Sequence, residues 1–161
     1  MTRVVGLLAV ACGLALPGGV RAADPGKEKD APVRVTVVVI FATTENNVVD
    51  KKLIDLAAEV QKRYPDLVGL KLGPTLQKSI PVGESHTFAL EVEEQTVKVV
   101  IDKPKDKNGR VGLTVTPPGG EAVSYTCACD KFFPLVTPYK TKCGKRVIVA
   151  VGARPCTGQG P

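Results

Sequence analysis

From Leu67 onward, apolar residues recur at almost every second position, and this alternation constrains the fold more than any other feature of the chain. Successive side chains of a strand point to opposite faces of a sheet, so a period of two predicts strands with one buried face. Turn residues separate the alternating segments, as at Gly73-Pro74 and Asn108-Gly109. We therefore expect a long antiparallel β-meander that continues to Cys129.

Two segments are apolar on both faces. The first predicted strand, Val33 to Ala42, alternates at its start but is continuously apolar from Val37 to Phe41. The last predicted strand, Lys145 to Gly152, is nearly continuous apolar sequence. Such runs are typical of strands that other elements cover on both sides.

One helix is expected from Val48 to Tyr64. Asn47 is a suitable N-cap, and Pro65 ends the helix. Apolar residues at spacings of three and four form one stripe along it, namely Val49, Leu53, Leu56, Val60 and Tyr64. A β-helix-β opening followed by an antiparallel meander predicts an α+β domain.

The first 22 residues are typical of a signal peptide. Arg3 precedes an apolar run from Val4 to Leu16, and small residues precede a predicted cleavage site after Ala22. The run is shorter than the roughly 20 apolar residues that a membrane-spanning helix needs. We therefore expect an exported protein, periplasmic or extracellular, without a transmembrane span. The alternative is a lipoprotein signal in which Cys12 is acylated.

Beyond the signal peptide, composition predicts a flexible leader (23–32), a single α+β domain (33–156) and a disordered tail (157–161). Residues 24–102 carry 10 basic and 13 acidic side chains, whereas residues 103–161 carry 10 and 3. The basic C-terminal half favours an acidic partner, such as a glycan or an envelope protein, although edge lysines also limit aggregation. Export argues against nucleic acid, and so does the lack of a recognisable reading surface on which aromatic residues are interleaved with basic ones.

Four cysteines follow the signal peptide: Cys127, Cys129, Cys143 and Cys156. An oxidising compartment makes disulfides their default state. Cys127 and Cys129 share one face of a strand and lie side by side, so we do not expect them to bond each other. Cys143 and Cys156 stand at opposite ends of the last strand, roughly 25 Å apart at about 3.3 Å per residue, which is too far for a disulfide.

The pairing depends on the segment from Phe132 to Thr141. If this segment is a strand, Cys129 and Cys156 come to the same end of the sheet, and we prefer this pair. If it is a loop, Cys143 approaches Cys127 or Cys129 instead. The sequence does not decide whether Cys127 and Cys143 bond each other. The rival is a zinc site built from all four cysteines, but one Cys-x-Cys and two single cysteines differ from the usual Cys-x-x-Cys knuckles. We therefore predict no metal and no cofactor.

Few residues suit catalysis. His86 is the single histidine, and its place at the start of an alternating strand favours a partly packed ring over a general base. Glu91 and Glu93 share one side, but spacing alone does not predict a pair of carboxylates across a cleft. No glycine pattern before a helix predicts a phosphate loop. A hydrolase with a site around His86 stays an alternative to a protein without enzyme activity.

A binding surface is predicted near the C-terminus. Phe132, Phe133 and Tyr139 are flanked by basic residues, namely Lys131, Lys140, Lys142, Lys145 and Arg146. Aromatic rings beside cations suit an acidic glycan or a protein partner. The alternative is that the two phenylalanines fill the end of the sheet while the lysines are solvated.

The same region carries a resemblance. Residues 132–156, FFPLVTPYKTKCGKRVIVAVGARPC, resemble the closing portion of small exported bacterial proteins of the kind numerous in planctomycetes. The resemblance implies export and a disulfide role for Cys156, and it brings no activity. The sequence as a whole predicts a non-enzymatic binding or assembly module of the cell envelope or the extracellular space, with a C-terminal sheet stapled by disulfides.

Overall fold

The computed structural model of the protein describes residues 31–156. The predicted signal peptide, most of the leader, the C-terminal tail and Cys12 lie outside these residues. The elements are β1 (Val33–Thr43), the short 3₁₀ helix η2 (Lys51–Leu53), α1 (Ile54–Arg63), β2 (Gly69–Ile80), β3 (Ser85–Ala89), β4 (Thr96–Lys103), β5 (Arg110–Thr116), β6 (Val123–Ala128), β7 (Phe132–Lys140) and β8 (Arg146–Pro155).

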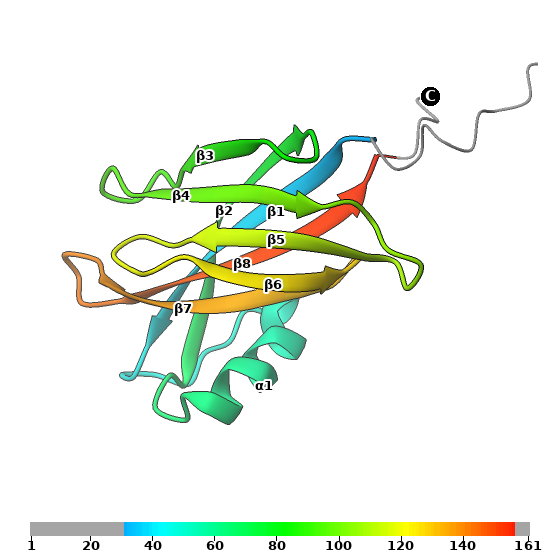
Figure 1. Ribbon diagram of the computed structural model, residues 1–161. Coiled ribbons are helices and arrows are strands. Elements are labelled where there is room, and N and C mark those ends of the chain that lie inside the picture. The colour runs from blue at the N-terminus through cyan, green and yellow to red at the C-terminus, as the bar shows by residue number, and fades with distance from the viewer. Residues whose placement is uncertain (1–30, 157–161) are drawn as a thin grey trace, which may run out of the picture.

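The strands form two four-stranded antiparallel sheets that pack face to face, and α1 lies against the outside of one of them (Figure 1). Sheet A has the order β2-β1-β8-β7, and sheet B has the order β3-β4-β5-β6. The chain therefore begins in sheet A, crosses to sheet B after β2, and returns to sheet A for β7 and β8. The predicted mixed fold with antiparallel pairing is confirmed.

The main core fills the space between the two sheets. On β1 the inward residues are Val33, Val35, Val37 and Val39, each at most 1% exposed. Their partners from sheet B include Val97, Val99, Ile101, Leu113 and Val115. These positions are every second residue of their strands, so the alternation seen in the sequence forms this core directly.

A second core lies between sheet A and α1. Ile40 and Ala42 of β1 and Ile148 and Ala150 of β8 point away from sheet B and are buried. The helix covers them with Leu53, Ala57 and Val60. The prediction that the first and last strands are covered on both sides is therefore confirmed for these parts of β1 and β8.

The helix is shorter than the stripe of apolar residues predicted. Val48 is 70% exposed and precedes it, and the first turn is the 3₁₀ helix η2. The N-cap is Asp50, whose carboxylate accepts a hydrogen bond from the Lys52 N–H at 3.0 Å, and Asn47 plays no such part. Val49 instead forms a single bridge with Leu70, and this bridge holds the chain extended before the helix begins.

Two strand predictions change in detail. The two short strands expected around Gly73-Pro74 are one strand, β2, because the turn-like residues form an irregularity in its pairing with β1 and do not end it. The segment from Phe132 to Thr141 is mostly strand, as preferred above, although its pairing with β8 is interrupted after Val136. Within residues 31–156, no helix is both long and apolar enough to cross a membrane.

Candidate functional site

The four cysteines described by the structure are free thiols, and no two of them lie at bonding distance. The expected disulfide staple of the C-terminal sheet is therefore absent from this structure. Cys129 and Cys156 do come to the same end of sheet A, since Phe132 pairs with Gly152 and β8 ends three residues later. The Cys156 sulfur, however, lies 3.4 Å from the hydroxyl of Ser79 on β2, which is the strand at the opposite edge of the sheet from β7.

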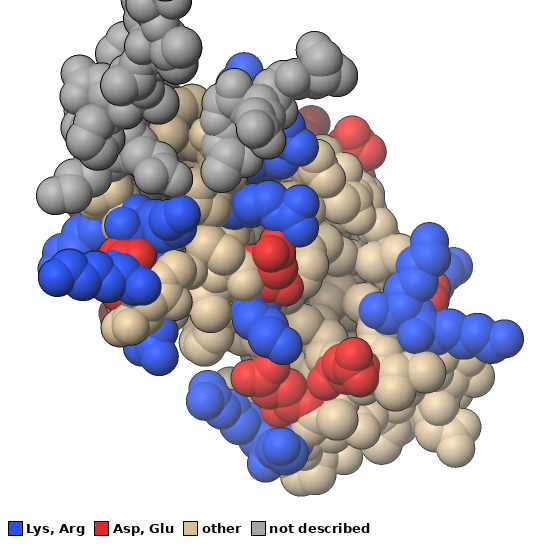
Figure 2. Space-filling model, turned by 90° about the vertical axis from the view of Figure 1, so that its right-hand side faces the viewer, with Lys and Arg blue, Asp and Glu red and all other residues tan. Residues whose placement is uncertain are grey.

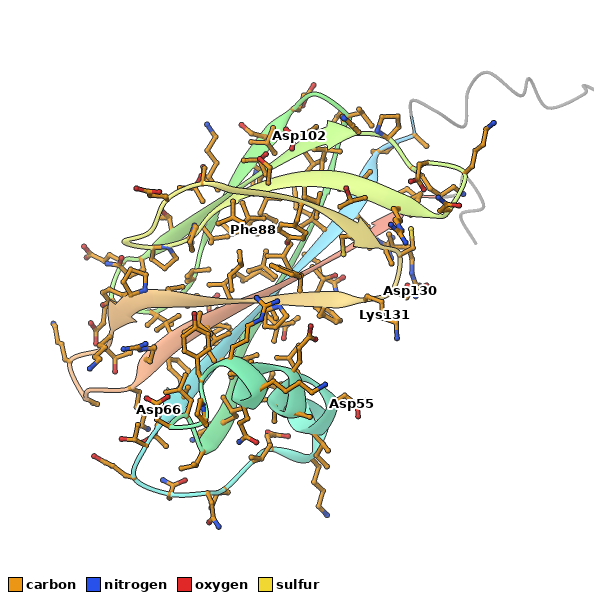
Figure 3. All side chains as sticks on the ribbon, turned by 60° about the horizontal axis from the view of Figure 1, so that its bottom comes forward. Asp55, Asp66, Phe88, Asp102, Asp130 and Lys131 are labelled. Carbon is orange, nitrogen blue, oxygen red and sulfur yellow. The ribbon has the colours of Figure 1, made fainter. Side chains whose placement is uncertain are left out.

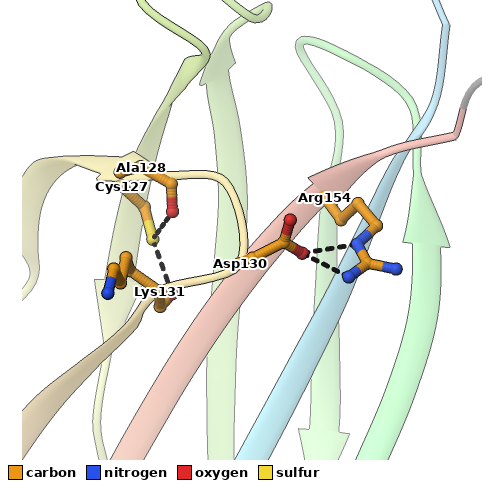
Figure 4. A network of polar contacts seen from close by, with 5 residues as sticks. All are labelled: Cys127, Ala128, Asp130, Lys131 and Arg154. Atoms are coloured by element: carbon orange, nitrogen blue, oxygen red, sulfur yellow. Dashed lines mark hydrogen bonds and ion pairs between the residues drawn. The ribbon is translucent and has the colours of Figure 1, made fainter.

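Cys127 has a structural role in the turn that joins the two sheets. Its thiol is buried and donates to the backbone carbonyls of Lys131 at 3.2 Å and Ala128 at 3.4 Å (Figure 4). Burial raises the pKa of the Cys127 thiol, and burial followed by the nearby Asp130 raises that of Cys129. Both sulfurs are therefore held as thiols, which are poor nucleophiles and poor metal ligands.

Cys143 lies far from the other three, at the exposed tip of the hairpin between β7 and β8. Among the described residues, no group of three or more histidine, cysteine, aspartate or glutamate side chains is placed to hold a metal ion.

The predicted binding surface divides between the two ends of β7. Lys131 and Phe132 stand at its start, whereas the second group stands at its end and in the following hairpin. That second group contains Tyr139, Lys140, Lys142, Lys145 and Arg146. β7 is nine residues long, which at about 3.3 Å per residue separates the groups by most of its length. These residues do not form a single patch.

The two phenylalanines point to opposite sides of β7. Phe133 packs inward and stacks on Tyr125 of β6, with ring centroids 4.4 Å apart and an angle of 29° between the planes. Phe132 points to the outer face of sheet A and is 41% exposed. The alternative that a phenylalanine fills the end of the sheet is thus correct for Phe133 and wrong for Phe132.

At the hairpin end, Glu93 connects the two sheets. Its carboxylate accepts hydrogen bonds from the Tyr139 hydroxyl and, at 2.7 Å, from the Lys142 N–H. These two bonds hold the pKa of Glu93 below its usual value, and the same carboxylate raises the pKa of Tyr139. The Tyr139 hydroxyl is therefore occupied in a contact between the sheets.

The open surface of interest is the outer face of sheet A beside the helix. Strand register places Gln77, Thr36, Gly152 and Phe132 in one row across the four strands. Thr75, Val38, Ala150 and Pro134 form the next row toward α1. The helix covers the rows beyond these and leaves the first row uncovered, so a groove remains between α1 and the end of the sheet.

The groove consists of two hollows that share Asp130, Lys131 and Phe132. The hollow beside the helix has a volume of about 440 Å³ and is bounded by Asp55, Leu56 and Glu59. The hollow at the end of the sheet has a volume of about 310 Å³ and is bounded by Arg34, Gln77 and Arg154. We call the two together the outer groove. Figure 3 shows Asp55 on the same side of the molecule as Asp130 and Lys131.

Phe132 forms the floor between the two hollows because it lies over a glycine. A Cβ atom added to Gly152 would stand 3.0 Å from the ring of Phe132. A side chain at position 152 would therefore crowd the ring, which would have to shift by a few tenths of an ångström. Small residues at 150 and 152 on β8 keep the groove deep enough to expose one side of the ring.

A tight turn sets the charged rim of the groove. Asp130 has a positive φ of 66°, which is uncommon for a residue other than glycine. Its carboxylate accepts from the Arg154 guanidinium, with the Nε nitrogen 2.5 Å away (Figure 4). Both side chains are exposed, so this ion pair contributes little to the stability of the fold. It mainly holds the two side chains in place at the rim of the groove.

Figure 2 shows the side of the molecule that lies at the right in Figure 1. Basic and acidic side chains are interleaved there and do not gather in a single basic patch. The sheet end of the groove has three cations, Arg34, Lys131 and Arg154, and one acid, Asp130. The helix side has Asp55 and Glu59 opposite Lys52. The uneven charge along the sequence therefore does not become a uniformly basic surface here.

Sequence reasoning identified Lys131 and Phe132 but missed the other residues of the groove. Arg34 and Thr36 are the polar residues of the alternating start of β1. That signal becomes informative only once the register aligns them with Gln77, Gly152 and Arg154 on neighbouring strands.

His86 does not stand in a catalytic arrangement. Its ring packs edge-on against Phe88, with centroids 4.8 Å apart and planes at 88°. It borders neither hollow of the outer groove, and the partly packed position agrees with the structural role expected for it. Ser124, Thr114 and Asp102 form a short hydrogen-bonded row on the exposed face of sheet B.

A comparison with protein-family models found no match, and comparisons with curated proteins and with solved structures found none either. The function proposed below accordingly depends on the residues of the chain alone.

Proposed function

We propose that the protein is an exported, non-enzymatic binding module of the cell envelope or the extracellular space, and that it takes its ligand in the outer groove. The observation that carries this proposal is the exposed ring of Phe132 in a groove where several neighbouring charges are unpaired. Arg34, Lys131 and Glu59 form no ion pair with any described residue. An acidic glycan or a protein segment is the ligand class that the cations first suggest.

The groove has the composition of a binding site and lacks that of an active site. A ligand gains most from an aromatic anchor that is partly desolvated, with polar groups around it that set orientation. Phe132 supplies the anchor, and Thr36 and Gln77 supply side-chain hydroxyl and amide groups that form no hydrogen bond within residues 31–156.

The experiment compares two exposed aromatic residues. Phe132 is 41% exposed inside the groove and Tyr64 is 37% exposed outside it. Titration calorimetry with an oligohexuronate and with short charged peptides should show saturable binding of at least one probe. We expect Phe132→Ala to weaken that binding by about fivefold, because an aromatic contact contributes roughly 1 kcal/mol, and Tyr64→Ala to leave it unchanged. Equal effects of the two substitutions, or no binding of any probe, would refute the proposed site.

Export also belongs to this proposal, and with it the pairing of Cys129 with Cys156. Their common end of sheet A supports the pair, but the bond requires Cys156 to leave its contact with Ser79. The expected result after export is a mass for the intact protein that starts at Ala23 and rises by about two hydrogens per disulfide on reduction. An unchanged mass on reduction would leave the thiols as the structure shows them.

A further inference from the structure

The outer groove has opposite charges at its two ends. The hollow at the sheet end is bounded by three cations and one acid, and Asp130 is already bonded to one of those cations. The hollow beside the helix is bounded by two acids of α1, Asp55 and Glu59, and by one cation of η2, Lys52, so acidic side chains are in excess there. The floor between them has a single aromatic ring and few charges.

The charges at both ends are available to a ligand. Within residues 31–156, Arg34 at one end and Asp55 and Glu59 at the other make no ion pair or hydrogen bond through their side chains. Unpaired charges of opposite sign at the two ends of one groove favour a ligand that pairs with both.

The distance between the ends suits a short extended chain. Arg34 and Val38 lie four positions apart on β1, and Val38 borders the hollow beside the helix. At about 3.3 Å per residue this spacing is roughly 13 Å. A ligand that reaches from Arg34 into the hollow beside the helix must therefore span about four extended residues.

The polar side chains of the floor suit a peptide backbone. Gln77 is exposed and Thr36 is half-buried, and both flank the exposed ring in one row. An amide and a hydroxyl without partners can accept from and donate to backbone groups, while the ring of Phe132 takes one apolar side chain.

We infer that the ligand of the outer groove is an extended peptide segment with acidic side chains at one end and basic side chains at the other. This inference rests on the proposed function and narrows it. A polyanionic glycan fits the sheet end but meets Asp55 and Glu59 at the helix side, where like charges repel. A peptide with both signs of charge satisfies both ends at once.

The test uses two fluorescent peptides of identical composition. One carries two aspartates, a Ser-Leu-Ser spacer and two lysines in that order, and the other carries the same charges interleaved. A fluorescent oligohexuronate is the third probe. Fluorescence anisotropy with the exported protein should give about tenfold tighter binding of the segregated peptide, since several weak exposed pairs act together.

Two charge variants locate the effect. Glu59→Lys makes the helix side of the groove more basic, and we expect it to reduce the preference for the segregated peptide at least threefold and to strengthen oligohexuronate binding. Lys142→Glu at the far hairpin changes the net charge by the same amount in the opposite direction and should change neither. Circular dichroism of both variants would establish that they are folded.

The outcomes separate the inference from the proposed function. Equal affinity for the two peptides would overturn the inference. Tighter binding of the oligohexuronate, weakened by Phe132→Ala, would overturn it as well but would leave the groove as the binding site. A preference for the segregated peptide that persists in Phe132→Ala and Glu59→Lys would place the site elsewhere and would refute both.

Discussion

The two sheets have equal numbers of strands and the same antiparallel pairing, but their outer faces differ. Sheet A is partly covered by α1, and its central strands are apolar on both faces where the helix lies. Sheet B has no such cover among the described residues, and its outward residues are mainly Ser85, Thr87, Lys98, Thr114, Ser124 and Thr126.

The difference shows how the groove arises. The helix is shorter than sheet A is long, so β1 changes from apolar to polar outward residues between Val38 and Thr36. The outward residues of sheet B are mostly polar along its strands, without a boundary of this kind. A covering element that stops midway along a sheet leaves a step, and the step forms one wall of a binding site.

The largest expected effect tests the two-sided burial of sheet A. Ile148→Ala removes a fully buried side chain between β8 and α1 and should lower the free energy of unfolding by about 2–5 kcal/mol. Val100→Ala, at a half-buried outward position of β4, should cost about 1 kcal/mol or less. Urea denaturation measures both, and similar losses would mean that the helix contributes no core.

Two threonines, one in each sheet, give a second test of the difference between sheet A and sheet B. Thr137 is 1% exposed, and its hydroxyl donates to the Val147 carbonyl at 2.7 Å where the pairing of β7 with β8 is irregular. Thr137→Val should cost about 1–3 kcal/mol, because it leaves that carbonyl buried without its partner. Thr114→Val on the exposed face of sheet B should change stability by about 0.5 kcal/mol or less. Urea denaturation again decides, and equal costs would contradict the assigned role of Thr137.

The link between the sheets should depend on pH. The pKa of Glu93 is lowered in the folded protein, so its stabilising effect is present at neutral pH and is lost as the pH falls below the ordinary value of 4.5. We expect Glu93→Gln to be less stable than the parent protein at pH 7 and to approach it at pH 3. Thermal unfolding across this range measures the difference, with Glu91→Gln as the control. A difference that does not change with pH would argue against the carboxylate as the link.

The smallest effect is expected at the rim of the groove. Asp130→Gly relieves a left-handed backbone that costs about 1–2 kcal/mol, but it also removes an exposed ion pair of at most about 1 kcal/mol and adds the entropy cost of glycine. The net change in stability should be about 0.5 kcal/mol or less, by urea denaturation. A large decrease in the free energy of unfolding would show that the rim of the groove stabilises the fold.

Much of the fold could be predicted from the sequence, because the alternation that defines the strands is itself the pattern of burial. Val97, Val99 and Ile101 belong to the alternating series that begins at Leu67, and all three are buried. The division of the strands into two sheets could not be predicted, since alternation is the same whether the next strand continues a sheet or crosses to another. The start of the helix was placed too early because Val48 and Val49 fit the stripe but lie in an extended segment.

The candidate site was predictable only in part, for a physical reason. Lys131 and Phe132 are neighbours in sequence, so their combination was visible. Arg34 and Glu59 join them only through pairing and packing between distant segments. The contact of Cys156 with Ser79 could not be predicted for a similar reason, because being at the same end of a sheet leaves open which strand each sulfur faces.

The position of β8 in sheet A determines when folding can be completed relative to synthesis and translocation. β1 and β8, the first and last strands, pair along nearly their whole length, so sheet A cannot assemble before the final residues are present. Contacts this distant in sequence require closure of a long loop and make folding slow. We propose that the chain crosses a membrane from its N-terminus. Translocation must therefore finish before sheet A can fold. A nascent chain without its last strand remains a substrate for chaperones.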